Sequence, residues 1–101
     1  MIAYKDAFFD DKSKSLCMVM EFADEGDLLS HIKKRATSKP RYFKEEYIWT
    51  TFFQICWGIA ALHQLDILHR DLKSANIFLT KQEGAKIGDL NVSKVMQEGF
   101  L

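Results

Sequence analysis

One segment limits the possible folds more than any other: the 19 residues from Tyr47 to Leu65 include no Asp, Glu, Lys or Arg. An apolar run of about 18–20 residues is long enough to span a membrane, but such a run is also typical of a helix in a protein core. Polar side chains such as Thr50 and Gln54 dilute the hydropathy, and Trp57 lies in the middle of the segment rather than at an end. We therefore expect a largely buried core helix from Glu45 to about Gln64, with a single membrane span as the alternative.

The composition restricts the class of protein. The 14 Lys and Arg balance the 14 Asp and Glu, so the formal net charge is zero, which argues against nucleic-acid binding because nucleic-acid-binding proteins are normally basic. The hydrophobic fraction of 48% is too high for a disordered chain. A length of 101 residues allows one small domain or a piece of a larger one. Cys17 and Cys56 lie in apolar runs without metal-ligand spacing, which favours free thiols in a reducing compartment.

The first third of the chain predicts a β-hairpin followed by a short helix. Ile2–Phe9 roughly alternates apolar and polar residues, and Leu16–Met20 is a continuous apolar run, as expected of a strand buried on both faces. Gly26 ends this pattern, and a helix is predicted over Asp27–Arg35, with an acid at its start and bases at its end. The basic cluster Lys33–Lys44 is either a solvated surface or an attraction for an acidic partner.

A polar octapeptide, His69–Asn76 (HRDLKSAN), leads directly into a second predicted hairpin. The apolar run Ile77–Thr80 predicts a strand, and the tetrapeptide KQEG predicts a turn in which Gly84 takes a positive φ. Ala85–Gly88 predicts the returning strand.

This hairpin brings three oxygen-bearing side chains to one end. Its register places Asn76 beside Asp89, with Cα atoms roughly 5 Å apart, and Asp71 lies just before the same end. Two carboxylates and an amide in one small volume are costly unless a cation neutralises them, and hard oxygen ligands select Mg²⁺. The sequence therefore predicts a magnesium site between the octapeptide and the open end of the hairpin.

The octapeptide resembles the catalytic loop of eukaryotic protein kinases, H-R-D-L-x-x-x-N, and Lys73 fits the form typical of serine/threonine kinases. The resemblance implies ATP and Mg²⁺ as cofactors and a Ser or Thr hydroxyl of a protein substrate as the acceptor. Asp71 would accept the proton of that hydroxyl, and Lys73 would neutralise charge on the migrating phosphoryl group. Asn76 would bind a second Mg²⁺ and hold Asp71, while Asp89 would chelate the metal that bridges the nucleotide phosphates.

A wider resemblance covers most of the chain. The stretches LCMVMEFADEGDL, YFKEEYIWTTFFQICWGIAALH, ILHRDLKSANIFL and KIGDLNVSKV are similar to the NIMA-related (Nek-type) serine/threonine kinases. By this resemblance Met20 is the gatekeeper, and Glu21, Phe22 and Ala23 form the hinge, whose backbone groups would bind the adenine edge. Phe78 would lie beneath the adenine ring.

The resemblance implies an α+β fold that is a partial protein kinase domain. Residues 1–20 would be small-lobe strands, 21–26 the hinge, and 27–101 the start of the large lobe, ending within the activation segment. The glycine-rich loop, the phosphate-gripping lysine and its partner glutamate have no counterpart in the sequence. We therefore interpret the chain as a kinase fragment, whose missing kinase segments or a partner chain would cover the exposed core.

For the same reason we expect the chain by itself not to catalyse phosphoryl transfer. A catalytically inactive, truncated or pseudokinase-like binding module is the alternative class. Leu90 and Asn91 stand where D-F-G has Phe and Gly, and Asn is among the few residues that adopt left-handed backbone at modest cost. Family analogy implies a cytoplasmic location, with association to the cytoskeleton or a cilium, and no membrane partner.

Overall fold

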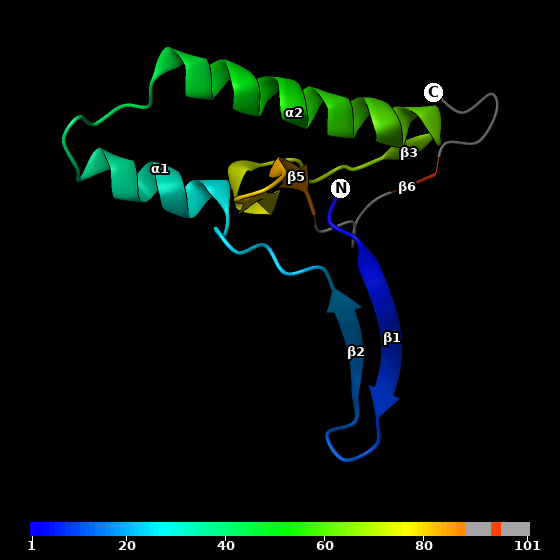
Figure 1. Cartoon of the computed structure of the whole chain (residues 1–101). Coiled ribbons are helices and arrows are strands. Elements are labelled where there is room, and N and C mark those ends of the chain that lie inside the picture. Colours follow the sequence, from blue (N-terminus) through cyan, green and yellow to red (C-terminus); the bar gives the residue numbers. More distant parts are fainter. Residues whose placement is uncertain (89–93, 96–101) are drawn as a thin grey trace.

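The computed structural model describes residues 1–88 and the backbone of residues 94–95. Its three sheets each have two antiparallel strands, β1–β2, β4–β5 and β3–β6. The β4–β5 hairpin packs against both helices, and the β1–β2 hairpin extends away from them (Figure 1). The elements are β1 (Tyr4–Asp10), β2 (Ser15–Met20), α1 (Leu28–Ala36), α2 (Glu45–Gln64), β3 (Ile67–Leu68), the 3₁₀ turn η1 (Ser74–Asn76), β4 (Ile77–Thr80), β5 (Gly84–Ile87) and β6 (Lys94–Val95).

The first two strands form the predicted hairpin, in which Tyr4 lies opposite Met20. The expectation that Leu16–Met20 is buried on both faces is wrong: Leu16 is 70% exposed and Met18 is 46% exposed. Within the described residues β2 pairs with β1 alone, and a two-stranded ribbon has too little surface to bury its own side chains.

The helix predicted after Asp27 is confirmed as α1. The carboxylate of Asp27 caps the helix, because Oδ2 accepts the backbone N–H of Ser30 at 2.9 Å and Oδ1 accepts the Ser30 hydroxyl at 2.8 Å. These hydrogen bonds hold the pKa of Asp27 below its ordinary value. The last turn carries Lys33, Lys34 and Arg35, whose charges suit the carbonyl end of the helix dipole.

The uncharged segment forms α2 with the predicted bounds, but the expectation that this helix is largely buried is wrong. Thr51 and Leu62 are its buried residues. The strands of the β4–β5 hairpin have four residues each and cover one side of a 20-residue helix. Large side chains exposed elsewhere on the helix are Tyr47, Ile48, Trp49, Phe52, Phe53 and Trp57. In the part of the chain that the structure describes, no helix is both long and apolar enough to span a membrane.

Two short elements, β3 and η1, lie in the segment between α2 and β4. Strand β3 pairs with β6, with Ile67 opposite Val95 and Leu68 opposite Lys94. The turn η1 ends at Asn76, and β4 begins at the next residue. The β3–β6 pair joins segments far apart in sequence, so no local pattern indicates it.

The core lies in the β4–β5 hairpin and beneath α2. Strand β4 has its predicted bounds, and β5 begins at Gly84 rather than Ala85. The side chains that point from the hairpin toward the helices are buried, and Ile87 is 1% exposed. The buried cluster consists of Ile77, Leu79, Ala85 and Ile87, and partly buried Leu28, Ile55 and Ile59 pack against it.

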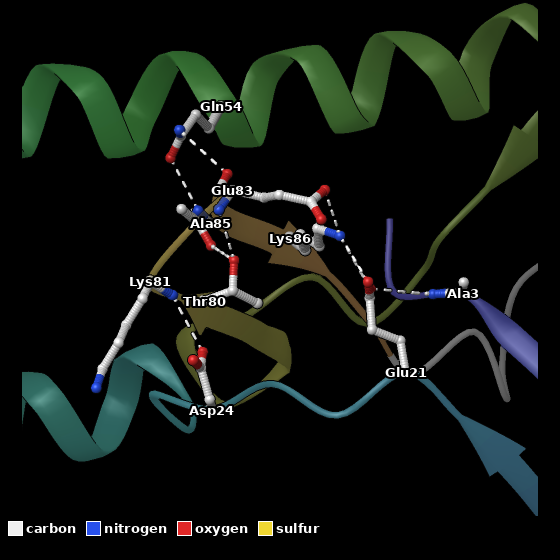
Figure 2. A network of polar contacts seen from close by, with 10 residues as sticks. Ala3, Glu21, Asp24, Gln54, Thr80, Lys81, Glu83, Ala85 and Lys86 are labelled. Carbon is white, nitrogen blue, oxygen red and sulfur yellow. Dashed lines mark hydrogen bonds and ion pairs between the residues drawn. The ribbon is translucent and has the colours of Figure 1, made fainter.

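The turn of this hairpin depends on Gly84, which has the predicted positive φ, here +73°. Gln54 reaches the same turn from α2 (Figure 2). Its Oε1 accepts the backbone N–H of Ala85 at 2.8 Å, and its Nε2 donates to the carbonyl of Glu83 at 3.4 Å. A Cβ on Gly84 would collide with the Gln54 amide. The backbone conformation therefore favours glycine, and a larger residue would displace the Gln54 amide from its hydrogen bonds.

We predict that Gly84→Ala lowers the free energy of unfolding by about 2–3 kcal/mol, because it adds left-handed strain and disrupts the Gln54 hydrogen bonds. Urea denaturation followed by circular dichroism measures the loss. Gly26→Ala is the matched control, since Gly26 has the same φ of +73° but no heavy atom within 4 Å of an added Cβ. The control should lose about 1 kcal/mol; equal losses in both variants would contradict the contribution assigned to Gln54.

Candidate active site

The octapeptide is tied to the end of β5 through His69, which is 6% exposed. Its Nδ1 accepts the backbone N–H of Asp71 at 3.2 Å, so in the neutral ring the proton resides on Nε2. That nitrogen donates to the carbonyl of Gly88 at 2.7 Å. His69 therefore fixes the backbone of the loop relative to the returning strand of the hairpin.

Asn76 makes the central contact of the site. Its side chain is buried, and Nδ2 donates to the backbone carbonyl of Asp71 at 2.8 Å and to the carboxylate Oδ2 at 3.2 Å. Its backbone carbonyl accepts the N–H of Gly88 at 2.9 Å. One residue thus holds the loop with its side chain and the hairpin with its main chain.

Lys73 completes the group of predicted catalytic residues. Its Nζ lies 3.7 Å from Asp71 Oδ1, and the side chains of Lys73 and Asp71 are 59% and 41% exposed. The ion pair is therefore open to solvent and contributes little to stability, although both charges remain accessible to a ligand. The structure brings Asp71, Lys73 and Asn76 together, and their catalytic roles stay predictions.

Asp89, the other predicted metal ligand, lies outside the described residues, so its juxtaposition with Asn76 stays a prediction. Among the described residues, no group of three or more His, Cys, Asp or Glu side chains is arranged to hold a metal ion.

A cavity of about 450 Å³ lies beside this site, between β2, the segment after it and β4. All five residues predicted to bind the adenine line it: Met20, Glu21, Phe22, Ala23 and Phe78. A Cβ on Gly88 would collide with the Phe78 ring, so the glycine lets the backbone pass close to that ring. The structure therefore places the predicted hinge and Phe78 around a shared space.

The hinge backbone is partly used by the fold itself. The N–H of Glu21 donates to the carbonyl of Ala3 at 2.8 Å, and the carbonyl of Ala23 accepts the N–H of Gly26 at 3.2 Å. Among the described residues, no hydrogen bond involves the carbonyl of Glu21 or the N–H of Ala23. One acceptor and one donor thus stay available along this edge of the cavity.

A charged network that the sequence does not reveal fixes the first hinge residue (Figure 2). Lys86 Nζ on β5 donates to Glu21 Oε2 at 2.8 Å and to Oε1 at 3.0 Å, and lies 2.7 Å from Glu83 Oε2. The hydrogen bond from Lys86 holds the pKa of Glu21 below its ordinary value. The hydrogen bonds to Glu21 and Glu83 hold the pKa of Lys86 above its ordinary value.

Comparison with known proteins agrees with this geometry. The family model of the protein kinase domain matches residues 1–100, and the chain belongs to that family. It is 38% identical over 95% of its length to the serine/threonine-protein kinases Nek3 and Nek1 of Mus musculus, and 35% identical over 95% of its length to Nek3 of Oryza sativa subsp. japonica. The chain spans 18%, 8% and 16% of these three relatives, respectively. The resemblance to Nek-type serine/threonine kinases is confirmed, as is the partial kinase-like α+β fold.

We predict that the contribution of Glu21 to stability disappears in acid. Because its pKa is lowered in the folded state, the ion pair stabilises the fold above the ordinary glutamate pKa of about 4.3 and is lost as the pH falls through the folded value. The urea midpoint of the original chain should therefore exceed that of Glu21→Gln near neutral pH and converge with it in acid. Asp11→Asn, in the β1–β2 turn, is the control for the change in net charge; a pH-independent difference between the original chain and Glu21→Gln would contradict the assignment.

Proposed function

We propose that the chain forms the adenine-binding hinge and the catalytic loop of a serine/threonine protein kinase, which transfers the terminal phosphoryl group of ATP to a Ser or Thr hydroxyl of a protein. The strongest support is the side chain of Asn76, which is 5% exposed and donates to two oxygens of Asp71. Phosphoryl transfer relies mainly on positioning and charge neutralisation. A buried amide that orients a carboxylate provides this positioning.

Asp71 acts in this proposal as the acceptor of the substrate proton. Asn76 engages Oδ2 at 3.2 Å, which leaves Oδ1, the oxygen nearer Lys73, to accept a hydrogen bond from an incoming hydroxyl. The side chain is 41% exposed, so a protein substrate can reach it. Lys73 places a positive charge next to the same oxygen, where it would neutralise negative charge on a phosphoryl group.

The cavity beside the loop fits an adenine ring. The Phe78 side chain offers a flat apolar surface on one side, and Met20 adds to the apolar lining. The carbonyl of Glu21 and the N–H of Ala23 would bond the polar edge of the base. Lys86 holds the Glu21 side chain at 2.8 Å, which keeps the hinge backbone in place for this contact.

Asn76 also fits a role as a magnesium ligand. Because Nδ2 donates to Asp71, the atom of this amide that remains for a cation is the oxygen Oδ1, and oxygen is the ligand that Mg²⁺ prefers. Asp89 is the second ligand in the proposal. Bound MgATP supplies the phosphoryl group, with its charge partly neutralised by the metal.

A cytoplasmic location accompanies this proposal. Cys17 and Cys56 are free thiols, which are typical of a reducing compartment where ATP is also present.

We predict that Phe78→Ala weakens ATP binding about tenfold, because stacking of a base on an aromatic ring contributes about 1–3 kcal/mol. Titration of the purified chain with a fluorescent ATP analogue measures the dissociation constant. Phe78→Leu keeps an apolar surface and should bind within a fewfold of the original chain. Phe9→Ala, on exposed β1, should leave the dissociation constant unchanged. A Phe78→Ala variant that binds ATP as tightly as the original chain would show that the Phe78 ring does not contact the adenine.

A chimera tests catalysis directly, with this chain replacing the matching segment of mouse Nek3. We predict that the chimera phosphorylates a Ser/Thr peptide and that Asp71→Asn lowers kcat at least about a hundredfold, because proton acceptance contributes about 10²–10⁴-fold. The isolated chain should transfer no more phosphate than its Asp71→Asn variant.

Asp66→Asn is the matched control for this chimera, since it makes the same charge change on the turn before the loop. Asp66 has a φ of 58°, a conformation that Asn tolerates. Equal kcat values for the Asp71→Asn chimera and the unmodified chimera would refute the catalytic role, and so would a folded, nucleotide-binding chimera without activity.

A further inference from the structure

A second cavity, which the kinase site does not use, lies on the other side of β4. Its volume is about 530 Å³, and residues of α1, the α1–α2 connection, α2 and the β4–β5 turn line it. We call it the α1–α2 hollow. It shares no lining residue with the adenine cavity: Phe78 lines that cavity, whereas Leu79 and Thr80 line the hollow. A ligand in the hollow would therefore leave the nucleotide site open.

The lining of the hollow carries more positive than negative charge. Arg35, Lys44 and Lys81 are among its lining residues, and Glu25 is the acidic residue in that set. Residues 31–44 contain six Lys and Arg and no Asp or Glu, and two of these cations, Arg35 and Lys44, belong to the wall of the hollow that this stretch forms. Because the whole chain is neutral, this positive charge is a local feature and not a consequence of overall composition.

The charges of two of these lining residues, Lys44 and Lys81, are not explained by the fold. Lys44 is the N-cap residue of α2 and makes no side-chain capping bond, and a cation at a helix N-terminus opposes the helix dipole. Neither Lys44 nor Lys81 has an ion-pair partner among the described residues. In contrast, Lys86 on the neighbouring strand is paired with two glutamates.

Contacts with neighbouring residues hold the aromatic side chains of this wall in place. The Arg35 guanidinium lies over the Phe43 ring, 5.2 Å from its centroid, and donates to the carbonyl of Pro40 at 3.5 Å. Phe43 stacks on Tyr47 with ring centroids 5.0 Å apart. The hollow thus combines positive charge at its edge with aromatic and aliphatic surface inside, including Tyr47 and Leu79.

We propose that the α1–α2 hollow binds an acidic segment of a partner protein, with an apolar side chain inserted among Phe43, Tyr47 and Leu79 and carboxylates near Lys44 and Lys81. The charge complementarity supports this occupant. The apolar interior, with Phe43, Tyr47 and Leu79, favours a peptide over a nucleic acid, because phosphates gain nothing from apolar contact. Docking here would hold a substrate or regulator on the kinase without occupying the hinge.

The experiment measures fluorescence anisotropy of a labelled peptide made of Glu and Asp around one Leu and one Phe, titrated with the full chain. We expect saturable binding that weakens at high salt, because exposed charges are screened, and that ATP does not displace. Lys44→Glu and Lys81→Gln should each weaken binding about three- to tenfold. Lys44→Glu replaces a cation at a helix N-terminus with an acid, so it should fold at least as well, and circular dichroism checks this.

Two controls accompany these variants. Lys12→Glu, in the β1–β2 turn, makes the same charge change as Lys44→Glu away from the hollow and should bind like the original chain. A peptide with Gln and Asn in place of the acids should bind at least tenfold more weakly. Binding that is indifferent to Lys44 and Lys81, equal binding of the neutral peptide, or tighter binding of a single-stranded oligonucleotide would each overturn the proposal.

Discussion

The arrangement of the site depends on the two-way attachment of Asn76. Its backbone carbonyl accepts the N–H of Gly88 at the open end of the β4–β5 hairpin. Its side-chain amide donates to the backbone carbonyl of Asp71 and to the carboxylate Oδ2 of the same residue. Because Asn76 is buried, its own polar atoms are shielded from competing water. His69 adds a second connection between the loop and Gly88. The octapeptide has little regular structure of its own, so these hydrogen bonds replace the rigidity that a helix or strand would supply.

The hairpin itself is positioned by contacts that reach it from three directions. Gln54 holds its turn from α2, the backbone of Glu25 and Gly26 bonds Leu79 on β4, and Lys86 on β5 pairs with Glu21. The predicted hinge, helix α2 and the octapeptide therefore all contact one small unit, the eight strand residues of the β4–β5 hairpin, which fixes their relative positions. This explains how a chain with few buried side chains still brings the cavity of the predicted adenine-binding residues to Gly88, the residue to which the octapeptide is bonded.

Local sequence patterns predict the parts of the fold that local physics determines. The bounds of α2 follow from Glu45 and Glu46 and the apolar run, the start of α1 follows from the Asp27 cap, and the turn follows from Gly84. Burial is different, because it depends on what covers a surface. The apolar patterns of β2 and α2 therefore predict a buried strand and helix, whereas the structure leaves Leu16 and Trp57 70% and 77% exposed. The β3–β6 pair and the partners of Lys86 are long-range and leave no pattern either.

The motif H-R-D-L-x-x-x-N identifies Asp71, Lys73 and Asn76 because phosphoryl transfer restricts those residue types, while nothing comparable restricts the residues of the α1–α2 hollow. A docking surface needs charge and shape but no fixed spacing, so the sequence reveals Lys33–Lys44 merely as a basic run. Folding decides which of those cations face a cavity: Arg35 and Lys44 do, joined by Lys81 from the hairpin turn. The same hairpin thus separates two cavities, with Phe78 facing one and Leu79 facing the other. Alternation along a single strand can therefore keep a bound nucleotide and a docked protein segment on opposite sides of the same hairpin.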